Sequence, residues 1–148
     1  MKLLDDRGLR DKTLLVFATD NGWIQDPDRN GFAPKSKSSP YDGGLRTPIL
    51  VRWPGHITPG RFDTPVSTID VVPTILAATG ITPREPLPGL DLREIAAHGG
   101  ACDRDGLFGA IFEHDIADPD DPARSLLSRW MLFEGRWKLI QPVGDQPA

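Results

Sequence analysis

The sequence predicts an α/β protein that ends in a small antiparallel sheet. Two short apolar runs, residues 14–18 and 48–51, have the length and the branched or aromatic composition of strands. Residues 67–79 repeat apolar side chains at helical spacing, and residues 130–140 read as a hairpin around Glu134-Gly135. Fifteen glycines and fifteen prolines in 148 residues fit a loop-rich α/β chain better than a helical bundle.

The composition argues against several kinds of partner. Seventeen basic and 21 acidic residues give a net charge of −4 without a basic stripe, so we expect no nucleic-acid partner. No apolar run approaches the roughly 18–20 residues that a membrane span needs. The single cysteine, Cys102, excludes an internal disulfide. The first ten residues contain no continuous apolar segment and so do not read as a secretory signal, which leaves the compartment open.

The first apolar run leads into a candidate site. Residues 14–18 are apolar on both faces, which predicts a strand inside a parallel sheet. The run stops at Asp20-Asn21-Gly22, and ligands of open α/β sheets bind beyond the carboxyl ends of the strands. Two hard oxygen donors with no His or Cys beside them favour Ca²⁺ or Mg²⁺ over zinc. The same residues also form turns, so an ordinary turn is the alternative interpretation.

The remaining elements follow from local signals. Residues 23–39 are rich in turn formers and predict a long loop, followed by a tight turn at residues 41–44 and a second strand over 47–52. In the helix, Pro73 must lie in the first turn, which places Asp70 at or beside the N-cap, and Gly80 is the C-terminal stop. We also expect a short helix over 92–97, a strand over 107–113 and a helical turn within 123–128.

Several phrases occur in an order that resembles a known family. The tetrapeptide TDNG is followed by K-x-x-x-Y-[DE]-G-G-[LM]-R-x-P and by R-W-P-G. STIDVVPTILAATGI, LPGLDL and GRWKLI come next, so the similarity covers most of residues 8–140. This pattern resembles the distal part of a sulfatase, in the alkaline-phosphatase-like superfamily. The resemblance implies a partial alkaline-phosphatase-like sheet followed by a small antiparallel subdomain. It implies that residues 1–100 form the distal part of the main α/β domain and that residues 101–148 form the small C-terminal subdomain with its terminal hairpin.

The resemblance also assigns roles to three residues. It implies that Asp20 and Asn21 complete a divalent-metal site, usually calcium with Mg²⁺ as the alternative, together with two aspartates from nearer the N-terminus of such proteins. It implies that Lys37, four residues before Tyr41, contacts the sulfate of a sulfate ester substrate. Lys35 keeps the ordinary interpretation of a solvated lysine.

Other polar residues are interpreted as structural. Tyr41, Asp42 and Arg46 match the family pattern, and we expect them to be scaffold, with Arg46 paired to a carboxylate. His56 and His98 have no spacing that suggests a metal site, and neither does His114, which stands between two acidic residues.

The family's nucleophile motif is not found in the sequence. Sulfatases resemble one another in C/S-x-P-x-R, whose Cys or Ser is oxidised to formylglycine, and Cys102 has neither the Pro nor the Arg at that spacing. We therefore predict a sulfatase fragment. Formylglycine is expected in an N-terminal half, which could be a separate partner, and no catalytic residue is assigned within this chain. Alone, the chain is expected to have negligible activity.

Two alternatives stay open. A phosphodiesterase or phosphonate hydrolase of the same superfamily resembles a sulfatase in its scaffold, although its metal motif more often carries His where Asn21 stands. A non-catalytic binding module is the other alternative. Against it, half a parallel sheet would leave an unpaired edge and an uncovered core.

Overall fold

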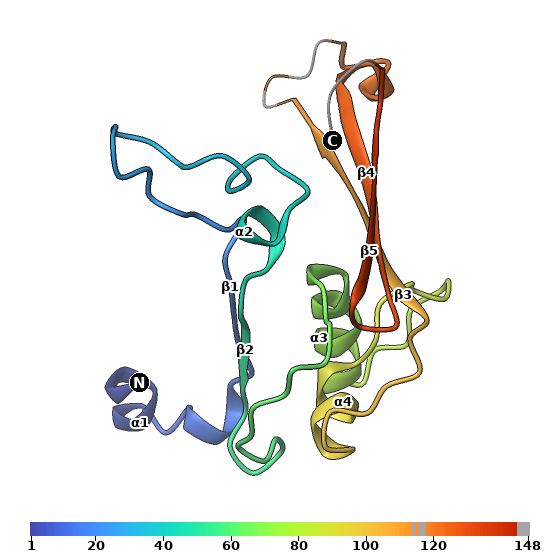
Figure 1. Ribbon diagram of the computed structural model, residues 1–148. Coiled ribbons are helices and arrows are strands. Elements are labelled where there is room, and N and C mark those ends of the chain that lie inside the picture. Colours follow the sequence, from blue (N-terminus) through green and yellow to red (C-terminus); the bar gives the residue numbers. More distant parts are fainter. Residues whose placement is uncertain (114, 116–117, 145–148) are drawn as a thin grey trace. The chain divides into compact units, whose positions relative to one another are not determined.

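The structure is a computed structural model that describes residues 1–113, 115 and 118–144 (Figure 1). His114 lies outside the described residues. The chain forms two compact units: residues 1–18 with 49–104, and residues 19–48 with 105–148. The mixed helix-and-strand fold that the sequence predicts is confirmed. The predicted domain boundary at residue 100 stays a prediction.

The first unit contains an antiparallel strand pair, which corrects the predicted parallel sheet. β1 (Leu15–Ala18) pairs with β2 (Ile49–Arg52), with Leu15 opposite Arg52 and Ala18 opposite Ile49. Within the described residues β1 has no second neighbour, and the cross-strand partners Phe17 and Leu50 are 51% and 57% exposed. The parallel direction was wrongly predicted because an apolar run carries no information about strand direction.

The helices of the first unit are α1 (Lys2–Asp6), η1 (Arg10–Lys12), η2 (Thr68–Asp70), α3 (Val71–Thr79) and α4 (Leu92–Ala97). Of these, η2 with α3 and α4 lie at the residues for which the sequence predicts helices. Asp70 stands at the N-cap position of α3, but its side chain makes no cap hydrogen bond to this helix and instead forms a capping box with Ser67 at the start of η2. Gly80 ends α3 in the left-handed conformation with φ 70°. At the start of α4 the Asp91 carboxylate accepts a hydrogen bond from the backbone N–H of Arg93. These predictions are confirmed because both helices have local start and stop signals.

The Asp70 carboxylate is the polar centre of the first unit. Its side chain is fully buried and accepts hydrogen bonds from the backbone N–H groups of Ser67 and Leu90, each at 2.8 Å. The guanidinium of Arg104 binds both carboxylate oxygens, with Nη1 at 3.0 Å from Oδ2. One carboxylate thereby joins the start of α3 to two segments that lie 20 and 34 residues further along the chain.

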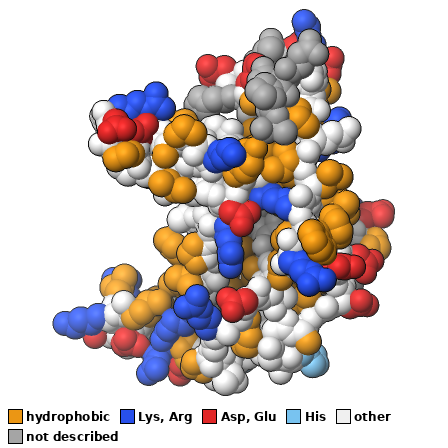
Figure 2. Space-filling view, viewed as in Figure 1, with side chains coloured by type: hydrophobic (Ala, Val, Ile, Leu, Met, Phe, Trp, Pro, Cys, Tyr) orange, Lys and Arg blue, Asp and Glu red, His pale blue; other side chains and the backbone are white. Residues whose placement is uncertain are grey.

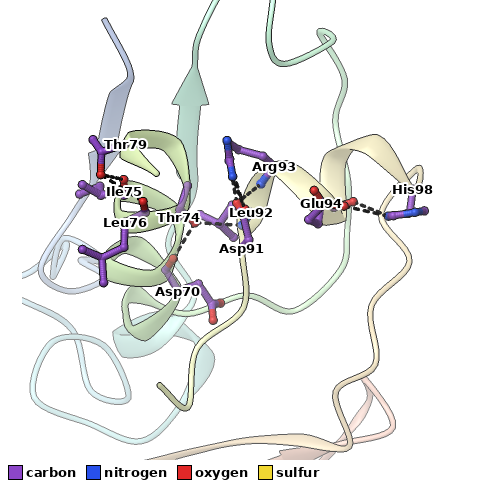
Figure 3. A network of polar contacts seen from close by, with 10 residues as sticks. All are labelled: Asp70, Thr74, Ile75, Leu76, Thr79, Asp91, Leu92, Arg93, Glu94 and His98. Atoms are coloured by element: carbon purple, nitrogen blue, oxygen red, sulfur yellow. Dashed lines mark hydrogen bonds and ion pairs between the residues drawn. The ribbon is translucent and has the colours of Figure 1, made fainter. Parts of the chain in front are cut away.

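A second buried side chain continues this network. The Thr74 hydroxyl donates to the backbone carbonyl of Asp70 at 2.6 Å and accepts from the backbone N–H of Leu92 at 2.9 Å, as Figure 3 shows. This contact holds the start of α4 against α3, where Leu92 and Ile95 are buried. Packing of α3 and α4 is therefore fixed by directional bonds as well as apolar contact.

The second unit contains a three-stranded antiparallel sheet. Its strands are β3 (Gly106–Phe112), β4 (Leu126–Phe133) and β5 (Trp137–Pro142), in the order β3-β4-β5. The hairpin between β4 and β5 turns through Glu134 and Gly135, both at positive φ, and matches the predicted hairpin. The unit also contains η3 (Pro122–Ser125) and α2 (Asp42–Leu45).

Much of the apolar surface stays exposed. In the part of the chain that the structure describes, the buried hydrophobic residues are Leu92, Ile95 and Leu107. Hydrophobic side chains are spread over the face shown in Figure 2. No helix among the described residues is both long and apolar enough to cross a membrane.

Candidate functional site

The candidate site lies in the loop formed by residues 19–48. Its ends continue from Ala18 and Ile49, which face each other across the β1–β2 pair. Within the loop the backbone N–H of Gly22 donates to the carbonyl of Gly44 at 2.8 Å, and that of Ile24 donates to the buried Ser36 hydroxyl at 2.6 Å. The loop is therefore closed by its own hydrogen bonds.

Close backbone packing beneath the site requires glycine. A Cβ atom at Gly22 would lie 2.2 Å from the carbonyl oxygen of Gly43, and one at Gly44 would lie 2.3 Å from that of Ser36. The predicted turn over residues 41–44 is instead the short helix α2, and neither Gly43 nor Gly44 is at positive φ. Gly43 and Gly44 are therefore needed because the backbone passes close to them, and not because the turn is left-handed.

Asp20 and Asn21 present oxygen atoms that the loop does not use. The backbone N–H of Asn21 donates to Oδ1 of Asp20 at 2.9 Å, and the Asn21 side-chain amide donates to the carbonyl of Gly22 at 2.9 Å. No described residue donates to Oδ2 of Asp20 or to the Asn21 amide oxygen. Just before them, the Thr19 hydroxyl oxygen is buried with no partner among the described residues. This arrangement suits a partial cation site, although the Asp20–Asn21 contact is also typical of a turn.

The ammonium of Lys37 lies near the segment that follows Asp20 and Asn21. Its Nζ is 5.8 Å from the centre of the Trp23 ring, and its side chain is half-buried. Lys35, in contrast, is exposed and holds its Nζ 4.7 Å from the centre of the Tyr41 ring. The two lysines therefore lie over different rings, and the predicted sulfate contact of Lys37 stays a prediction. The sequence assigned no contact to the Trp23 side chain, because one aromatic residue in a polar loop has no local pattern, although the segment 23–33 is the part of this chain expected to contribute to substrate specificity.

A metal ion would need more ligands than this loop provides. Ca²⁺ takes six to eight oxygen ligands, and Asp20 and Asn21 are two neighbouring residues. Across the described residues, no group of three or more His, Cys, Asp or Glu side chains is arranged to hold a metal ion. The oxygen ligands of Asp20 and Asn21 are of the type that calcium and magnesium bind, but they are too few to hold either ion.

Asp42 has the structural role that the sequence predicts. Its Oδ1 accepts a hydrogen bond at 2.9 Å from Nζ of Lys138, which also lies 5.5 Å from the centre of the Trp130 ring. The ion pair fastens α2 to β5. Within the described chain the guanidinium of Arg46 has no carboxylate partner, so its predicted pairing is not observed there.

A shallow pocket of about 290 Å³ lies elsewhere in the second unit. It is lined by Lys35, Ser38, Ser39, Pro40, Tyr41, Ile111, Leu127, Ser128, Ile140 and Pro142. None of Asp20, Asn21 and Lys37 lines it. The sequence offered no sign of this pocket, because its lining comes from several separate segments.

Comparison with known proteins identifies the family. Residues 1–81 match the family model described as Sulfatase, and this range includes Asp20, Asn21 and Lys37. The chain belongs to the sulfatase family. This sulfatase-family chain is 35% identical over 113 residues to arylsulfatase A of Homo sapiens, covering 73% of the chain and 22% of the relative. It is 28% identical over 162 residues to N-acetylgalactosamine-6-O-sulfatase of Bacteroides thetaiotaomicron, covering the whole chain and 29% of the relative.

A solved structure of the same superfamily resembles this chain. Phosphonate monoester hydrolase of Silicibacter pomeroyi superimposes with a TM-score of 0.74 and 27% identity, covering 99% of this chain and 29% of that protein. The sulfatase-family chain therefore spans less than a third of the length of these relatives. The predicted resemblance to the distal part of a sulfatase is confirmed.

Proposed function

We propose that this chain contributes one part of the metal site and one sulfate contact to a sulfuric ester hydrolase. The observation that carries the proposal is the loop over residues 19–48. It holds two hard oxygen donors with free acceptor atoms and a half-buried lysine above the ring of Trp23. All of these residues lie inside the range that matches the sulfatase family.

Asp20 and Asn21 would hold Ca²⁺, with Mg²⁺ as the alternative, through carboxylate and amide oxygens. A bound divalent ion would bind sulfate-ester oxygens and stabilise the charge that develops on them. The missing ligands and the formylglycine nucleophile would come from outside this chain. On this proposal the isolated chain has negligible activity, since the covalent step has no nucleophile here.

Lys37 would contact a sulfate oxygen through its ammonium. A lysine acts as a compact point charge on a flexible stem, which suits an anion whose other oxygens are held elsewhere. Its partner ring at Trp23 restricts the side chain without neutralising the charge.

A chimera tests the proposal. The C-terminal segment of the Bacteroides thetaiotaomicron enzyme that aligns with this chain would be replaced by residues 1–148, because that relative aligns with the whole chain. We expect hydrolysis of 4-nitrophenyl sulfate that depends on Ca²⁺. Lys37→Ala and Asp20→Ala should each lower kcat/KM by at least about 100-fold, since a lost charge contact to the reacting group is worth several kcal/mol.

Lys35→Ala is the matched control, because Lys35 is an exposed lysine two residues away that lies over another ring. The kcat/KM of the Lys35→Ala chimera should stay within about twofold of that of the unsubstituted chimera. An active chimera in which Lys37→Ala and Lys35→Ala behave alike would contradict the assignment of Lys37.

A phosphonate or phosphodiester hydrolase is the second candidate, favoured by the structural similarity to phosphonate monoester hydrolase. The amide of Asn21 weighs against it, because related phosphoryl-transfer sites more often carry His there. Assaying the chimera on phenyl phosphonate and 4-nitrophenyl sulfate in parallel separates the two. Because the host could impose its own preference, Asn21→His is the informative variant, and it should shift the ratio of rates toward the phosphonate.

A further inference from the structure

Two aromatic rings lie exposed next to the candidate sulfate contact. Trp23 is 52% exposed and Phe32 is 38% exposed. Their ring centres are 5.5 Å apart and their planes are inclined by 69°, so the two rings meet edge to face. Much of the apolar ring surface therefore stays available to a ligand.

The backbone between the two rings is fixed by hydrogen bonds. Gln25 and Phe32 form an isolated antiparallel bridge, and the backbone N–H of Ala33 donates to the carbonyl of Ile24 at 2.8 Å. Further out, the guanidinium of Arg29 donates to the Asp26 carboxylate at 2.6 Å. The rings are thus held on a hairpin-like loop, which lowers the conformational entropy lost when a ligand binds.

The position of Lys37 relates these rings to the proposed sulfate contact. Its Nζ lies 5.8 Å from the centre of the Trp23 ring. An ester of a ring compound carries its sulfate group only one or two bonds from the ring. A ligand whose sulfate contacts Lys37 would therefore have its ring within reach of Trp23.

We propose that Trp23 and Phe32 form an aromatic platform that binds the ring of a sulfated substrate while Lys37 holds the sulfate. The substrate class is a sulfate ester on a ring with an apolar face, whether aromatic or a sugar. Sulfate esters on flexible alkyl chains are disfavoured, because they lose more entropy on binding and offer no flat face. This inference deepens the proposed function and rests on its assignment of Lys37.

Binding is measured on the full chain by following the backbone N–H signals of residues 19–48 in ¹⁵N-labelled protein during titration, because these signals remain when Trp23 is replaced. The probes are 4-nitrophenyl sulfate, methyl β-galactopyranoside 6-sulfate, n-butyl sulfate and inorganic sulfate. We expect at least one of the two ring sulfates to bind about tenfold more tightly than n-butyl sulfate, and Trp23→Ala to remove that difference. The stronger of the two ring probes then identifies the ring as aromatic or sugar.

Trp137→Ala is the matched control, because Trp137 is 54% exposed and lies beside Arg136 on β5, outside the candidate loop. It should leave all four dissociation constants unchanged. Equal binding of the ring and butyl sulfates to the wild-type chain would overturn the platform. So would a ring preference that survives in Trp23→Ala.

The chimera described above provides a second readout that does not depend on stability of the isolated chain. In the chimera, Trp23→Ala should raise KM for the preferred ring sulfate about tenfold. The KM for n-butyl sulfate and the kcat for both substrates should stay within about twofold of the values of the unsubstituted chimera. Loss of all sulfate binding in Lys37→Ala with no effect of Trp23→Ala would refute the platform and keep the proposed function. Sulfate binding intact in Lys37→Ala would refute the role of Lys37 in the proposed function and with it this inference, even if Trp23→Ala loses the ring preference.

Discussion

Two aspartates in this chain have opposite environments. Asp70 is fully buried and accepts hydrogen bonds from two backbone N–H groups and a guanidinium. Asp20 is exposed and accepts one bond, from the N–H of the next residue. A carboxylate whose acceptor sites are filled by its own chain is a structural element, whereas one with a free oxygen can bind a ligand.

The same contrast holds for two cationic side chains, Arg104 and Lys37. The guanidinium of Arg104 is nearly buried and forms an ion pair with Asp70. The ammonium of Lys37 lies over the Trp23 ring and has no carboxylate partner among the described residues. Asp20 and Lys37 therefore each keep a charged group without an oppositely charged protein partner among the described residues, as ligand-binding side chains do.

The largest expected effect comes from breaking the buried pair. Asp70→Asn keeps the shape of the side chain but leaves Arg104 as an uncompensated buried charge, which should lower the free energy of unfolding by about 3–5 kcal/mol. Urea unfolding followed by circular dichroism measures this loss. Asp20→Asn, the matched exposed substitution, should stay within about 0.5 kcal/mol of wild type. Similar losses of stability in the two variants would show that the buried, paired carboxylate of Asp70 stabilises the fold no more than the exposed carboxylate of Asp20.

The pH dependence of stability should follow the same carboxylate. Burial by itself would raise the pKa of Asp70, but the hydrogen bonds from Arg104, Leu90 and Ser67 and the charge of Arg104 hold that pKa below its usual value of 3.8. Because the folded-state pKa is the lower one, this stabilisation is fully present above the unfolded-state pKa and is lost as the pH falls through the folded-state pKa.

We therefore expect the wild-type free energy of unfolding to fall below about pH 4, and this component to be missing from Asp70→Asn. Urea titrations between pH 3 and pH 7 measure it. Parallel profiles for the two proteins would show that other carboxylates dominate the acid response.

Close backbone contact is a property that the two regions share. A Cβ atom at Gly89 would lie 2.1 Å from the carbonyl oxygen of Ile69, and one at Gly22 would lie 2.2 Å from that of Gly43. Gly89→Ala and Gly22→Ala should each lower the free energy of unfolding by about 1–3 kcal/mol, because backbone must move. Gly80→Ala, with open space but positive φ, isolates conformational strain and should cost about 1 kcal/mol. A neutral Gly22→Ala would mean that the loop is looser than its hydrogen bonds imply.

Local signals made much of the scaffold predictable. The helix over Val71–Thr79 follows from local signals, namely the capping box of Ser67 and Asp70 just before it and Gly80 in the left-handed conformation at its end. The hairpin through Glu134 and Gly135 follows from alternation around a turn. The antiparallel direction of β1 and β2 did not follow, since pairing direction depends on how the intervening residues fold.

Long-range contacts limited what the sequence indicated about the site. Lys37 was found through its spacing from Tyr41, a resemblance rather than a contact. Its position over Trp23 required the loop to close through Gly22 and Gly44, and the Arg104 partner of Asp70 lies 34 residues away. Contacts between residues so far apart in the sequence leave no periodic pattern, so only the folded chain shows which residues are partners.

The smallest expected effect comes from the ion pair between Lys138 and Asp42. The Asp42 side chain is 69% exposed, so solvent screens the attraction, and the contact of Lys138 with the Trp130 ring adds little at such a surface. Lys138→Met should lower the free energy of unfolding by less than about 1 kcal/mol, and 1 M NaCl should reduce the difference from wild type. A double-mutant cycle with Asp42→Asn measures the coupling. A coupling above about 2 kcal/mol would place this pair with Asp70 and Arg104, and the loop that carries the candidate site would then depend on β5 for its fold.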